Sequence, residues 1–479
     1  MKPFYITTTL PYVNAEPHIG HALEFIQADT MARYKRQKLG KEQVFFNIGT
    51  DEHGLKIFQK ATEVEKTPKE FVDYFAQRFK DFCELFSISY DNFYRTSEAY
   101  HVPTVHKIWN ACMEKGDIYK KQYSGLYCVG CEGFKTEKDL VDGLCPDHGK
   151  APVLVEEENY FFKLSKYREE LLAYFKSNPE FLSPSSKIKE LENFVAELED
   201  ISVSRSSDKV PWGVQVPNDP TQTIYVWFDA LPNYIGAVGY ADDEARFQEW
   251  WPGVQIFGPD NLRFQCAIWQ GMLASAGLKF TTKALMHGTV LDEEGRKMSK
   301  SLGNGVSPFE QIEKYGLNYL RYYMAAVLPT YSNSSYKEQE LKDVCNSDLA
   351  DAYGNLLSRV VHMANLKEVE INNEAKVEES FKKEVMNFVE KAEAYFEKFE
   401  LNDGYRITHD LALFANKYIV DQAPWKMEEK SQIELVINNL SFAIHKLNDL
   451  YEPIIPEAVA KARDALEKRE KIVLFEKIV

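Results

Sequence analysis

Short apolar runs that alternate with amphipathic segments occupy most of the first two-thirds of the chain. Strands are predicted where apolar, β-branched and aromatic residues gather, at residues 4–10, 43–49, 223–229, 254–261 and 285–290. Residues 22–29 and 262–276 follow two of these runs and are predicted to be helical. Because strands that alternate with helices form parallel sheets, the pattern predicts an α/β fold with ligands at the carboxyl ends of the strands.

One further helix is marked by an aromatic stripe. Four phenylalanines recur at helical spacing and are expected in a core: Phe71, Phe75, Phe79 and Phe82. Thr67 and Glu70 stand three residues apart, with Pro68 between them, which is typical of a capping box at the start of a helix.

The last third of the chain has a different pattern of apolar positions. Long amphipathic helices are predicted at residues 348–366, 380–399, 404–420 and 433–450. The tail at residues 472–475 is the one candidate strand there. A helical bundle is therefore the simplest interpretation of this region.

Composition narrows the class of protein. The 479 residues are 44% apolar, which suits about three domains with buried cores. No apolar run is long enough to span a bilayer and the first residues lack a signal-peptide layout, so we expect no membrane partner and a cytoplasmic location. The net charge is −16, and residues 345–479 carry 18 basic against 25 acidic side chains. Any RNA must therefore bind a local patch, because a broad basic face is excluded.

Four residues of the types that bind metals occur in two pairs between the predicted halves of the sheet. Cys128 and Cys131 form one pair, thirteen residues intervene, and Cys145 and His148 form the second. This spacing is typical of tetrahedral Zn²⁺, and four protein ligands predict one closed structural site per chain. The remaining cysteines are expected to be small buried apolar residues: Cys83, Cys112, Cys266 and Cys345.

Two histidines stand where the first predicted strand leads into the first predicted helix. His18 and His21 follow Pro17, which suits a first helical turn, and Gly20 allows a ligand close to the backbone. A helix N-terminus favours phosphate, so these residues could form a nucleotide site. Alone, the pair is more often structural or half of a metal site.

A basic loop far downstream changes this balance, because the two segments together resemble the two signatures of class I aminoacyl-tRNA synthetases. The loop contains Lys297, Met298, Ser299, Lys300 and Ser301. The whole chain resembles the bacterial-type methionyl-tRNA synthetases with a single zinc. The matching stretches are the Cys₃His set and residues 10–12, 50–54, 226–230 and 421–425.

The resemblance implies a role for each matching residue. ATP with Mg²⁺ would be bound by His18, Gly20, His21, Lys297, Met298, Ser299, Lys300 and Ser301. Methionine would be bound by Leu10, Tyr12, Asp51, Trp227, Ala230, Leu231, Tyr234, Asn261 and Gln265. The anticodon would be bound by Asn355, Arg359 and Trp425. Plainer interpretations remain: Asp51 as a helix N-cap, the two tryptophans as packing, and Asn355 with Arg359 as a solvated helix face.

The implied activity is that of a methionine–tRNA ligase. L-Methionine and ATP would give methionyl-adenylate and pyrophosphate, and the methionyl group would pass to the 3′ end of tRNA(Met), including the initiator. One stretch departs from the family pattern, in which an Ile and a His stand at the positions of Asn261 and Gln265. Amino-acid selectivity is therefore the least secure implication.

The implied architecture is a split Rossmann-type parallel-sheet catalytic domain with a zinc-bearing insert, followed by an α-helical bundle. We expect catalytic halves at residues 1–115 and 226–335, the insert at 116–225 and the anticodon-binding bundle at 336–479. A monomer is expected, because no appended RNA-binding barrel follows the bundle. The alternatives are another class I synthetase, a small-molecule nucleotidyltransferase and a non-catalytic RNA-binding relative.

Overall fold

The computed structural model describes residues 2–128, 133–135, 137–146, 149–298, 303–372 and 376–478. The chain divides into two compact units, and each is described separately. The first, here called the sheet unit, comprises Met1–Pro17, Gln43–Glu84 and Tyr90–Met286. The second, the helical unit, comprises His18–Glu42, Leu85–Ser89 and His287–Val479.

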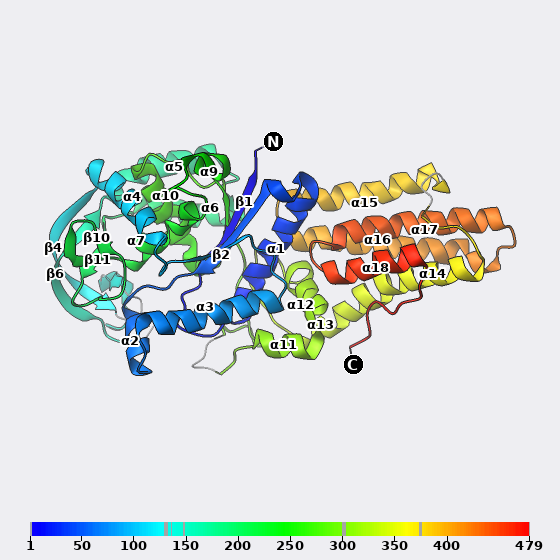
Figure 1. The fold of residues 1–479 in the computed structure, drawn as a ribbon, viewed down its shortest axis with the longest axis horizontal. Helices are drawn as coiled ribbons and strands as arrows, with labels where there is room; N and C mark the ends of the chain where they lie inside the picture. Colours follow the sequence, from blue (N-terminus) through cyan, green and yellow to red (C-terminus); the bar gives the residue numbers. More distant parts are fainter. Residues whose placement is uncertain are drawn as a thin grey trace. The chain divides into compact units, whose positions relative to one another are not determined.

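A six-stranded sheet forms the centre of the sheet unit, in the order β3-β2-β1-β12-β13-β7. Its strands β1 and β2 are labelled in Figure 1. Its strands are β1 (Phe4–Thr8), β2 (Val44–Thr50), β3 (Asn92–Arg95), β7 (Leu182–Ser183), β12 (Val254–Phe257) and β13 (Lys283–Met286). All neighbouring strands run parallel, with Ile6 opposite both Phe46 and Val254. The predicted parallel α/β fold is confirmed, and the two halves of the sequence meet between β1 and β12.

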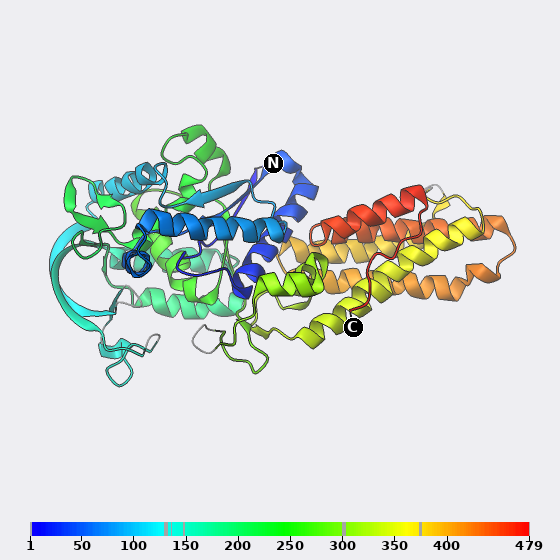
Figure 2. The same ribbon diagram turned by 60° about the horizontal axis from the view of Figure 1, so that its bottom comes forward.

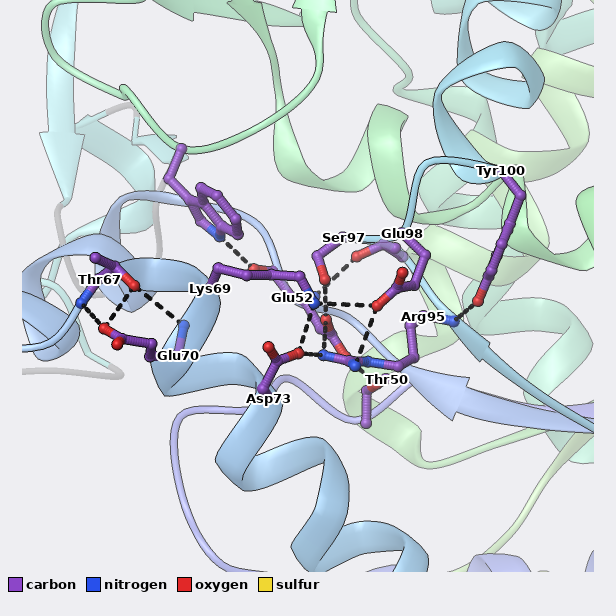
Figure 3. Close-up of polar contacts among 12 residues, drawn as sticks. Thr50, Glu52, Thr67, Lys69, Glu70, Asp73, Arg95, Ser97, Glu98 and Tyr100 are labelled. Atoms are coloured by element: carbon purple, nitrogen blue, oxygen red, sulfur yellow. Dashed lines mark hydrogen bonds and ion pairs between the residues drawn. The ribbon is translucent and has the colours of Figure 1, made fainter.

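Helices surround this sheet, and two of them, α3 and α10, were predicted from the sequence. They are α2 (Leu55–Glu63), α3 (Pro68–Leu85), α4 (His101–Glu114), α5 (Arg168–Ser177), α6 (Ile188–Ala196), α7 (Val226–Ala230), α8 (Asn233–Gly236), α9 (Glu244–Trp250) and α10 (Trp269–Ser275). A π-helical turn, Phe264–Ile268, leads into α10. The predicted capping box is present before α3: Thr67 N donates to Glu70 Oε2 (2.9 Å) and Glu70 N to Thr67 Oγ1 (3.3 Å), as Figure 3 shows.

The cores contain the predicted apolar residues with one exception. Phe71, Phe79 and Phe82 are buried, whereas Phe75 is half-buried against the Phe71 ring, with 4.9 Å between the ring centroids. The four cysteines expected to be buried are all fully buried: Cys83, Cys112, Cys266 and Cys345.

Antiparallel strands separate the two halves of the parallel sheet in sequence. One sheet has the order β5-β4-β6-β8 and a smaller one the order β10-β11-β9. Their strands are β4 (Ile118–Cys128), β5 (Gly133–Lys135), β6 (Val153–Phe162), β8 (Ile201–Ser202), β9 (Ser204–Ser206), β10 (Gln215–Val216) and β11 (Asp219–Ile224). Figure 2 shows β4 and β6 as a long curved ribbon. Strand β7 also comes from this part of the chain, yet it pairs with β13 at the edge of the parallel sheet.

The strand predicted at residues 223–229 is wrong over most of its length. Strand β11 ends at Ile224, and the following residues form α7, in which Asp229 N donates to Tyr225 O (3.0 Å). A short run that is apolar throughout has no period that separates strand from helix. Asp229 is buried and charged, and the partners that accommodate its side chain lie far away in sequence.

The helical unit contains the predicted bundle, whose helices run alongside one another in both views (Figures 1 and 2). Its elements are α1 (Ile19–Leu39), β14 (Val290–Leu291), α11 (Pro308–Tyr315), α12 (Leu317–Tyr322), β15 (Ser334–Ser335), α13 (Glu338–Val344), π-helical Cys345–Gly354, α14 (Asn355–Leu366), α15 (Glu379–Glu397), α16 (Leu401–Gln422), α17 (Lys430–Tyr451) and α18 (Pro456–Lys468). The four helices predicted from the sequence are all present. The candidate strand at residues 472–475 is not formed: Phe475 instead packs against the rings of Tyr319 and Tyr353.

A buried ion pair joins α1 to the rest of the helical unit. Arg321 on α12 is fully buried, and its Nη2 lies 2.6 Å from Asp29 Oδ2 on α1. Arg321 also donates to the carbonyl oxygens of Ile454 (2.6 Å) and Phe86 (3.0 Å). Burial opposes ionisation of Asp29, but Arg321 and then Arg33 outweigh it and lower the pKa of the carboxyl. One guanidinium therefore connects four segments of this unit.

Among the described residues, no helix combines the length and apolar character that crossing a bilayer requires.

Replacing Arg321 by Met tests this connection. The change leaves a buried carboxylate and buried carbonyl oxygens without their donor, so we expect the free energy of unfolding to fall by about 3–5 kcal/mol. Thermal and urea unfolding followed by circular dichroism measure the loss. Arg406→Met is the control, because Arg406 is exposed and its ion pair with Asp403 spans 3.3 Å; a change within about 0.5 kcal/mol is expected. Equal stabilities for the two variants would contradict this account.

Candidate functional site

His18 and His21 hold each other at the N-terminus of α1. His18 is the N-cap and its Nδ1 accepts from Gly20 N (3.1 Å), while His21 Nδ1 accepts from His18 N (3.2 Å). The two rings stack with centroids 3.7 Å apart and planes 17° apart. A backbone N–H can only donate, so each Nδ1 is an acceptor and each neutral ring carries its proton on Nε2. The sequence thus places two imidazole N–H donors at a helix N-terminus.

The surroundings of these rings keep one of them neutral. The pKa of His21 lies well below its usual range because of burial first, and then because of the neighbouring His18 and His287. A Cβ at position 20 would lie 3.0 Å from Cε1 of the His18 ring, so a side chain there would displace that ring slightly. A neutral imidazole can donate a hydrogen bond without bringing a charge.

The segment that leads into the basic loop is attached to α1. His287 Nε2 lies 3.0 Å from Glu24 Oε2, one turn beyond His21, and β14 packs against α1. Leu291 and Lys297 then face each other in a short antiparallel bridge. The structure therefore brings Lys297 and Met298 into the same unit as the histidine pair. Ser299, Lys300 and Ser301 lie outside the described residues.

Asp292 ties together the two ends of the basic loop. Its carboxylate accepts from Arg296 N (2.7 Å) and Arg296 Nε (2.8 Å) before the loop and from Asn304 Nδ2 (2.7 Å) after it. Desolvation opposes ionisation of Asp292, but Asn304 and Arg296 outweigh it and lower the pKa to about 2. The negative charge of Asp292 thus anchors a loop rich in lysine.

A second group of predicted residues lies where β1 and β2 end, within the sheet unit. Tyr12 and Asp51 face each other in a parallel bridge, and Asp51 N donates to Pro11 O (2.9 Å). Val13 N donates in turn to Asp51 O (3.1 Å). Asp51 is buried, and Leu10 precedes Tyr12 on the same strand extension. These residues therefore lie at the carboxyl edge of the sheet, where such folds bind ligands.

Aromatic residues of α7 and α8 and the π-helical turn form a third group. The Trp227 ring stacks on Phe264, with centroids 3.8 Å apart. Gln265 Nε2 donates to Tyr234 Oη (2.6 Å), which joins two predicted residues directly. Ala230 and Leu231 stand between Trp227 and Tyr234 in the sequence, and both are buried. Asn261 precedes Gln265 by one helical turn.

Glu52, the residue after Asp51, is held by a dense polar cluster that the sequence did not indicate (Figure 3). Arg95 on β3 donates to both carboxylate oxygens, from Nε (2.7 Å) and Nη2 (2.9 Å), and Thr50 Oγ1 donates to Oε1 (2.5 Å). Ser97 donates to Oε2, and Trp212 Nε1 donates to the backbone oxygen of Glu52 (2.6 Å).

Arg95 is itself surrounded by carboxylate side chains. Asp73 and Glu98 also pair with it, at 2.6 and 3.1 Å, as Figure 3 shows. Burial opposes the charge on Arg95, but the carboxylates of Glu52 and Asp73 outweigh it and raise the pKa of the guanidinium. The sequence shows that Glu52 is next to the predicted site residue Asp51. Its partner Arg95 comes from another strand, so no sequence signal indicated the pair.

Two of the four predicted zinc ligands lie within the described residues. Cys128 ends β4 and Cys145 lies in a turn, and both are buried. In that turn Gly149 N donates to Cys145 O (2.8 Å), and Gly149 has the positive φ of 61° that a tight turn needs. Cys131 and His148 lie outside the described residues. Within the described ones, no three His, Cys, Asp or Glu residues are grouped to hold a metal.

The three predicted anticodon residues gather at the start of α14 and the end of α16. The Arg359 guanidinium lies over the Trp425 ring, 5.8 Å from its centroid, and Trp425 is 43% exposed. Asn355 is exposed one turn before Arg359. Burial lowers the pKa of Arg359. An exposed tryptophan with a guanidinium on its face offers both stacking and charge to a ligand.

The chain is similar to known proteins over its whole length. The family model described as "tRNA synthetases class I (M)" matches residues 4–151 and 139–361. A methionine–tRNA ligase of Caldanaerobacter subterraneus subsp. tengcongensis is 39% identical over 488 residues, covering 100% of this chain and 76% of the relative. That of Thermotoga maritima is 39% identical over 470 residues (95% and 73%), and that of Nostoc sp. is 38% identical over 471 residues (95% and 88%).

Solved structures are similar over the same length. Mycobacterium tuberculosis methionyl-tRNA synthetase in complex with methionyl-adenylate has a TM-score of 0.90 and 34% identity, covering 97% of this chain and 94% of the other. The apo form of the same enzyme has a TM-score of 0.84, with 97% and 92% covered.

Replacing Glu52 by Gln tests the cluster in Figure 3. The neutral amide cannot accept from Arg95, Thr50 and Ser97 as the carboxylate does, so we expect the free energy of unfolding to fall by about 3 kcal/mol. Glu98→Gln is the matched control, because Glu98 pairs with the same Arg95 but is partly exposed; about 1 kcal/mol or less is expected. Thermal unfolding measures both, and a larger loss for Glu98→Gln would refute the assignment.

Proposed function

This chain belongs to the class I tRNA synthetases of the (M) family, and we propose that it is a methionine–tRNA ligase. The observation that carries the proposal is the full-length similarity to a methionyl-tRNA synthetase in complex with methionyl-adenylate. The chain would activate L-methionine with ATP and then load tRNA(Met), including the initiator tRNA. We also propose a cytoplasmic location, because translation there uses the loaded tRNA. The monomeric state stays a prediction.

The first step needs positioning and charge stabilisation more than acid–base chemistry. The carboxylate of methionine is ionised at neutral pH and attacks the α-phosphorus of ATP directly, so no general base is required. Charge then accumulates on the phosphates as pyrophosphate leaves. The Nε2–H groups of His18 and His21 supply donors for it, at a helix N-terminus whose dipole favours negative charge. Gly20 leaves room for the phosphates, and the loop from Lys297 to Ser301 would supply positive charge.

The residues proposed for methionine divide the substrate into a charged end and an apolar end. Asp51 supplies a carboxylate for the ammonium group at the carboxyl edge of the sheet. Leu10, Tyr12, Trp227, Ala230, Leu231 and Tyr234 would enclose the thioether, which packs favourably against aromatic rings. Gln265 donates to the Tyr234 hydroxyl and so determines its orientation, and Asn261 lies one turn away.

The second step requires a tRNA-binding surface on an acidic protein. Trp425 and Arg359 form a local patch of the required kind, with Asn355 beside them. Stacking of a base on an aromatic ring contributes roughly 1–3 kcal/mol and needs no broad basic surface. We propose that this patch binds the anticodon.

Two metals belong to the proposal. Mg²⁺ would arrive with ATP and neutralise phosphate charge. Zn²⁺ would be held by Cys128, Cys131, Cys145 and His148, and the support for this assignment is the spacing of three thiolates and one imidazole in two pairs. A closed site of this type stabilises the surrounding segment and takes no part in the reaction.

The first test measures exchange of pyrophosphate into ATP for methionine, leucine, isoleucine, valine and cysteine. We expect exchange with methionine alone. His21→Asn and Lys297→Ala should each lower it by about 10²–10³-fold, because each removes a group that stabilises charge in the transition state. His106→Asn is the control and should leave exchange unchanged, because His106 is a half-buried histidine of α4 whose Nε2 lies 2.9 Å from Gln215 O and which has no proposed role in ATP binding. Exchange that survives both substitutions would reject the proposed ATP site.

The second test separates the two steps with Trp425→Ala. We expect normal pyrophosphate exchange and an aminoacylation rate at low tRNA concentration reduced by about tenfold or more, because the stacking surface is lost. Leu413→Ala removes an equally exposed apolar side chain from α16 and should affect neither step. Equal loss of both activities in Trp425→Ala would indicate a fold defect instead of an anticodon contact.

The third test is elemental analysis of the purified protein. We expect about one zinc per chain, and a loss of most of it in Cys128→Ser and Cys145→Ser, since each removes a thiolate ligand. Cys83→Ala, at a buried cysteine of α3, should retain the metal. The same two serine variants should melt at lower temperature, because metal binding contributes to folding. Full zinc content in both serine variants would disprove the ligand set.

A further inference from the structure

A buried carboxylate between two histidines lies among the residues proposed for methionine. Asp229 on α7 is fully buried, and so is His101 at the start of α4. Asp229 Oδ2 accepts from His53 Nδ1 (2.6 Å) and Asp229 Oδ1 accepts from His101 Nε2 (2.8 Å). Nothing in the sequence pattern assigned a role to these three residues.

The hydrogen bonds determine where the protons are. A carboxylate only accepts, so His53 carries a proton on Nδ1 and His101 carries one on Nε2. His101 Nδ1 then accepts from the Tyr94 hydroxyl, 3.1 Å away. Burial opposes ionisation of Asp229, but the two imidazoles outweigh it and lower the pKa of the carboxyl to about 2. The cluster is thus a charged carboxylate with a full set of donors.

The sequence positions of these residues give the cluster its importance. His53 is two residues from Asp51, the proposed partner of the substrate ammonium. Asp229 is two residues from Trp227 and directly precedes Ala230 in the proposed thioether pocket. The hydrogen bond between His53 and Asp229 therefore connects the segment for the charged end of methionine to the segment for its apolar end.

Other contacts also hold the segment that carries His53. Glu52, between Asp51 and His53, is held by Arg95 and Thr50, as Figure 3 shows. The His53 ring also lies edge-on to Trp212, with 5.4 Å between centroids. A change in the length or direction of the bond to Asp229 must therefore be taken up by α7 itself.

We propose that Asp229 is a positioning residue for methionine: through His53 and His101 it sets the distance between Asp51 and the Trp227–Tyr234 segment. It does not touch the reacting atoms. The inference rests on the proposed function, because it concerns the site where methionine is proposed to bind. It adds a determinant of methionine affinity that acts from behind the pocket.

The experiment compares steady-state pyrophosphate exchange in Asp229→Asn and in the wild type. We expect KM for methionine to rise by at least about tenfold, because an error of about an ångström in a binding site has effects of this size. KM for ATP should stay within about twofold, since the residues proposed for ATP are on other segments. A merely structural role would lower the active fraction and leave both KM values unchanged.

Asp117→Asn is the matched control. Asp117 is also buried in the sheet unit, and its carboxylate accepts from Lys166 Nζ (2.6 Å), Ser275 Oγ (2.9 Å) and Tyr167. It should lose stability to a similar extent with KM for methionine unchanged. A rise in KM for methionine in both variants would overturn the proposal, because it would then follow from lost stability alone.

A pair of substitutions at His53 keeps the proposal testable if Asp229→Asn does not fold. His53→Leu removes the donor and should raise KM for methionine, whereas His53→Asn retains an N–H near the position of Nδ1 and should restore most of the affinity. In folded proteins, Asp229→Asn combined with His53→Leu should be no worse than the stronger single variant. Multiplying fold-changes would show that the two side chains act independently and would overturn the inference.

Failure of the proposed function would give a different result. In that case the wild type would not activate methionine but would exchange pyrophosphate with another amino acid. The same comparison of KM values, made with that amino acid, would then decide whether Asp229 positions its binding site. If KM stays within about twofold in every folded variant of Asp229 and His53, the inference is wrong whichever amino acid is activated.

Discussion

A carboxylate inside a protein stays ionised only when N–H and O–H donors replace the water that it loses. Three carboxylates with fully buried side chains meet this condition near the proposed sites: Asp29, Glu52 and Asp229. Each takes at least one donor from a distant part of the chain; Arg321 is 292 positions from Asp29, and His53 is 176 positions from Asp229. The need to satisfy these charges therefore determines which elements meet, in addition to the apolar pattern.

This constraint acts on geometry more than on stability. A buried ion pair gains little net free energy over an apolar replacement of the same size, but a buried charge that loses its partner costs several kcal/mol. Arrangements that separate the partners are therefore penalised, and one arrangement survives. At the end of β2 the effect falls on successive residues, since Glu52 is bound to Arg95 and His53 to Asp229. The backbone that presents Asp51 is held on its C-terminal side.

The sequence predicted the helices and strands whose apolar residues recur with a clear period. It did not predict segments whose conformation depends on contacts with distant residues. Long amphipathic segments such as residues 433–450 became α17, and the alternation of strands and helices gave the parallel sheet. Residues 223–229 and 472–475 are apolar without a distinguishing period; most of the strand predicted at residues 223–229 is helical, and the candidate strand at residues 472–475 is not formed. Among site residues, the hydrogen bond between Gln265 and Tyr234 joins two predicted positions. Arg95 and His101 were not predicted, because they are far in sequence from Glu52 and Asp229 and meet them only in the folded protein.

The distribution of charge around the proposed nucleotide site follows from the same physics. His21 is kept neutral by burial and by its histidine neighbours, so α1 offers N–H donors that need no counter-ion when no nucleotide is bound. Permanent positive charge is placed instead on the Lys297 loop, whose two ends are tied to Asp292. If both imidazoles were protonated, their positive charges and those of the two lysines would repel one another whenever no phosphate was bound. Neutral donors on the rigid helix and cations on the tethered loop avoid that repulsion and still provide attraction once phosphate binds.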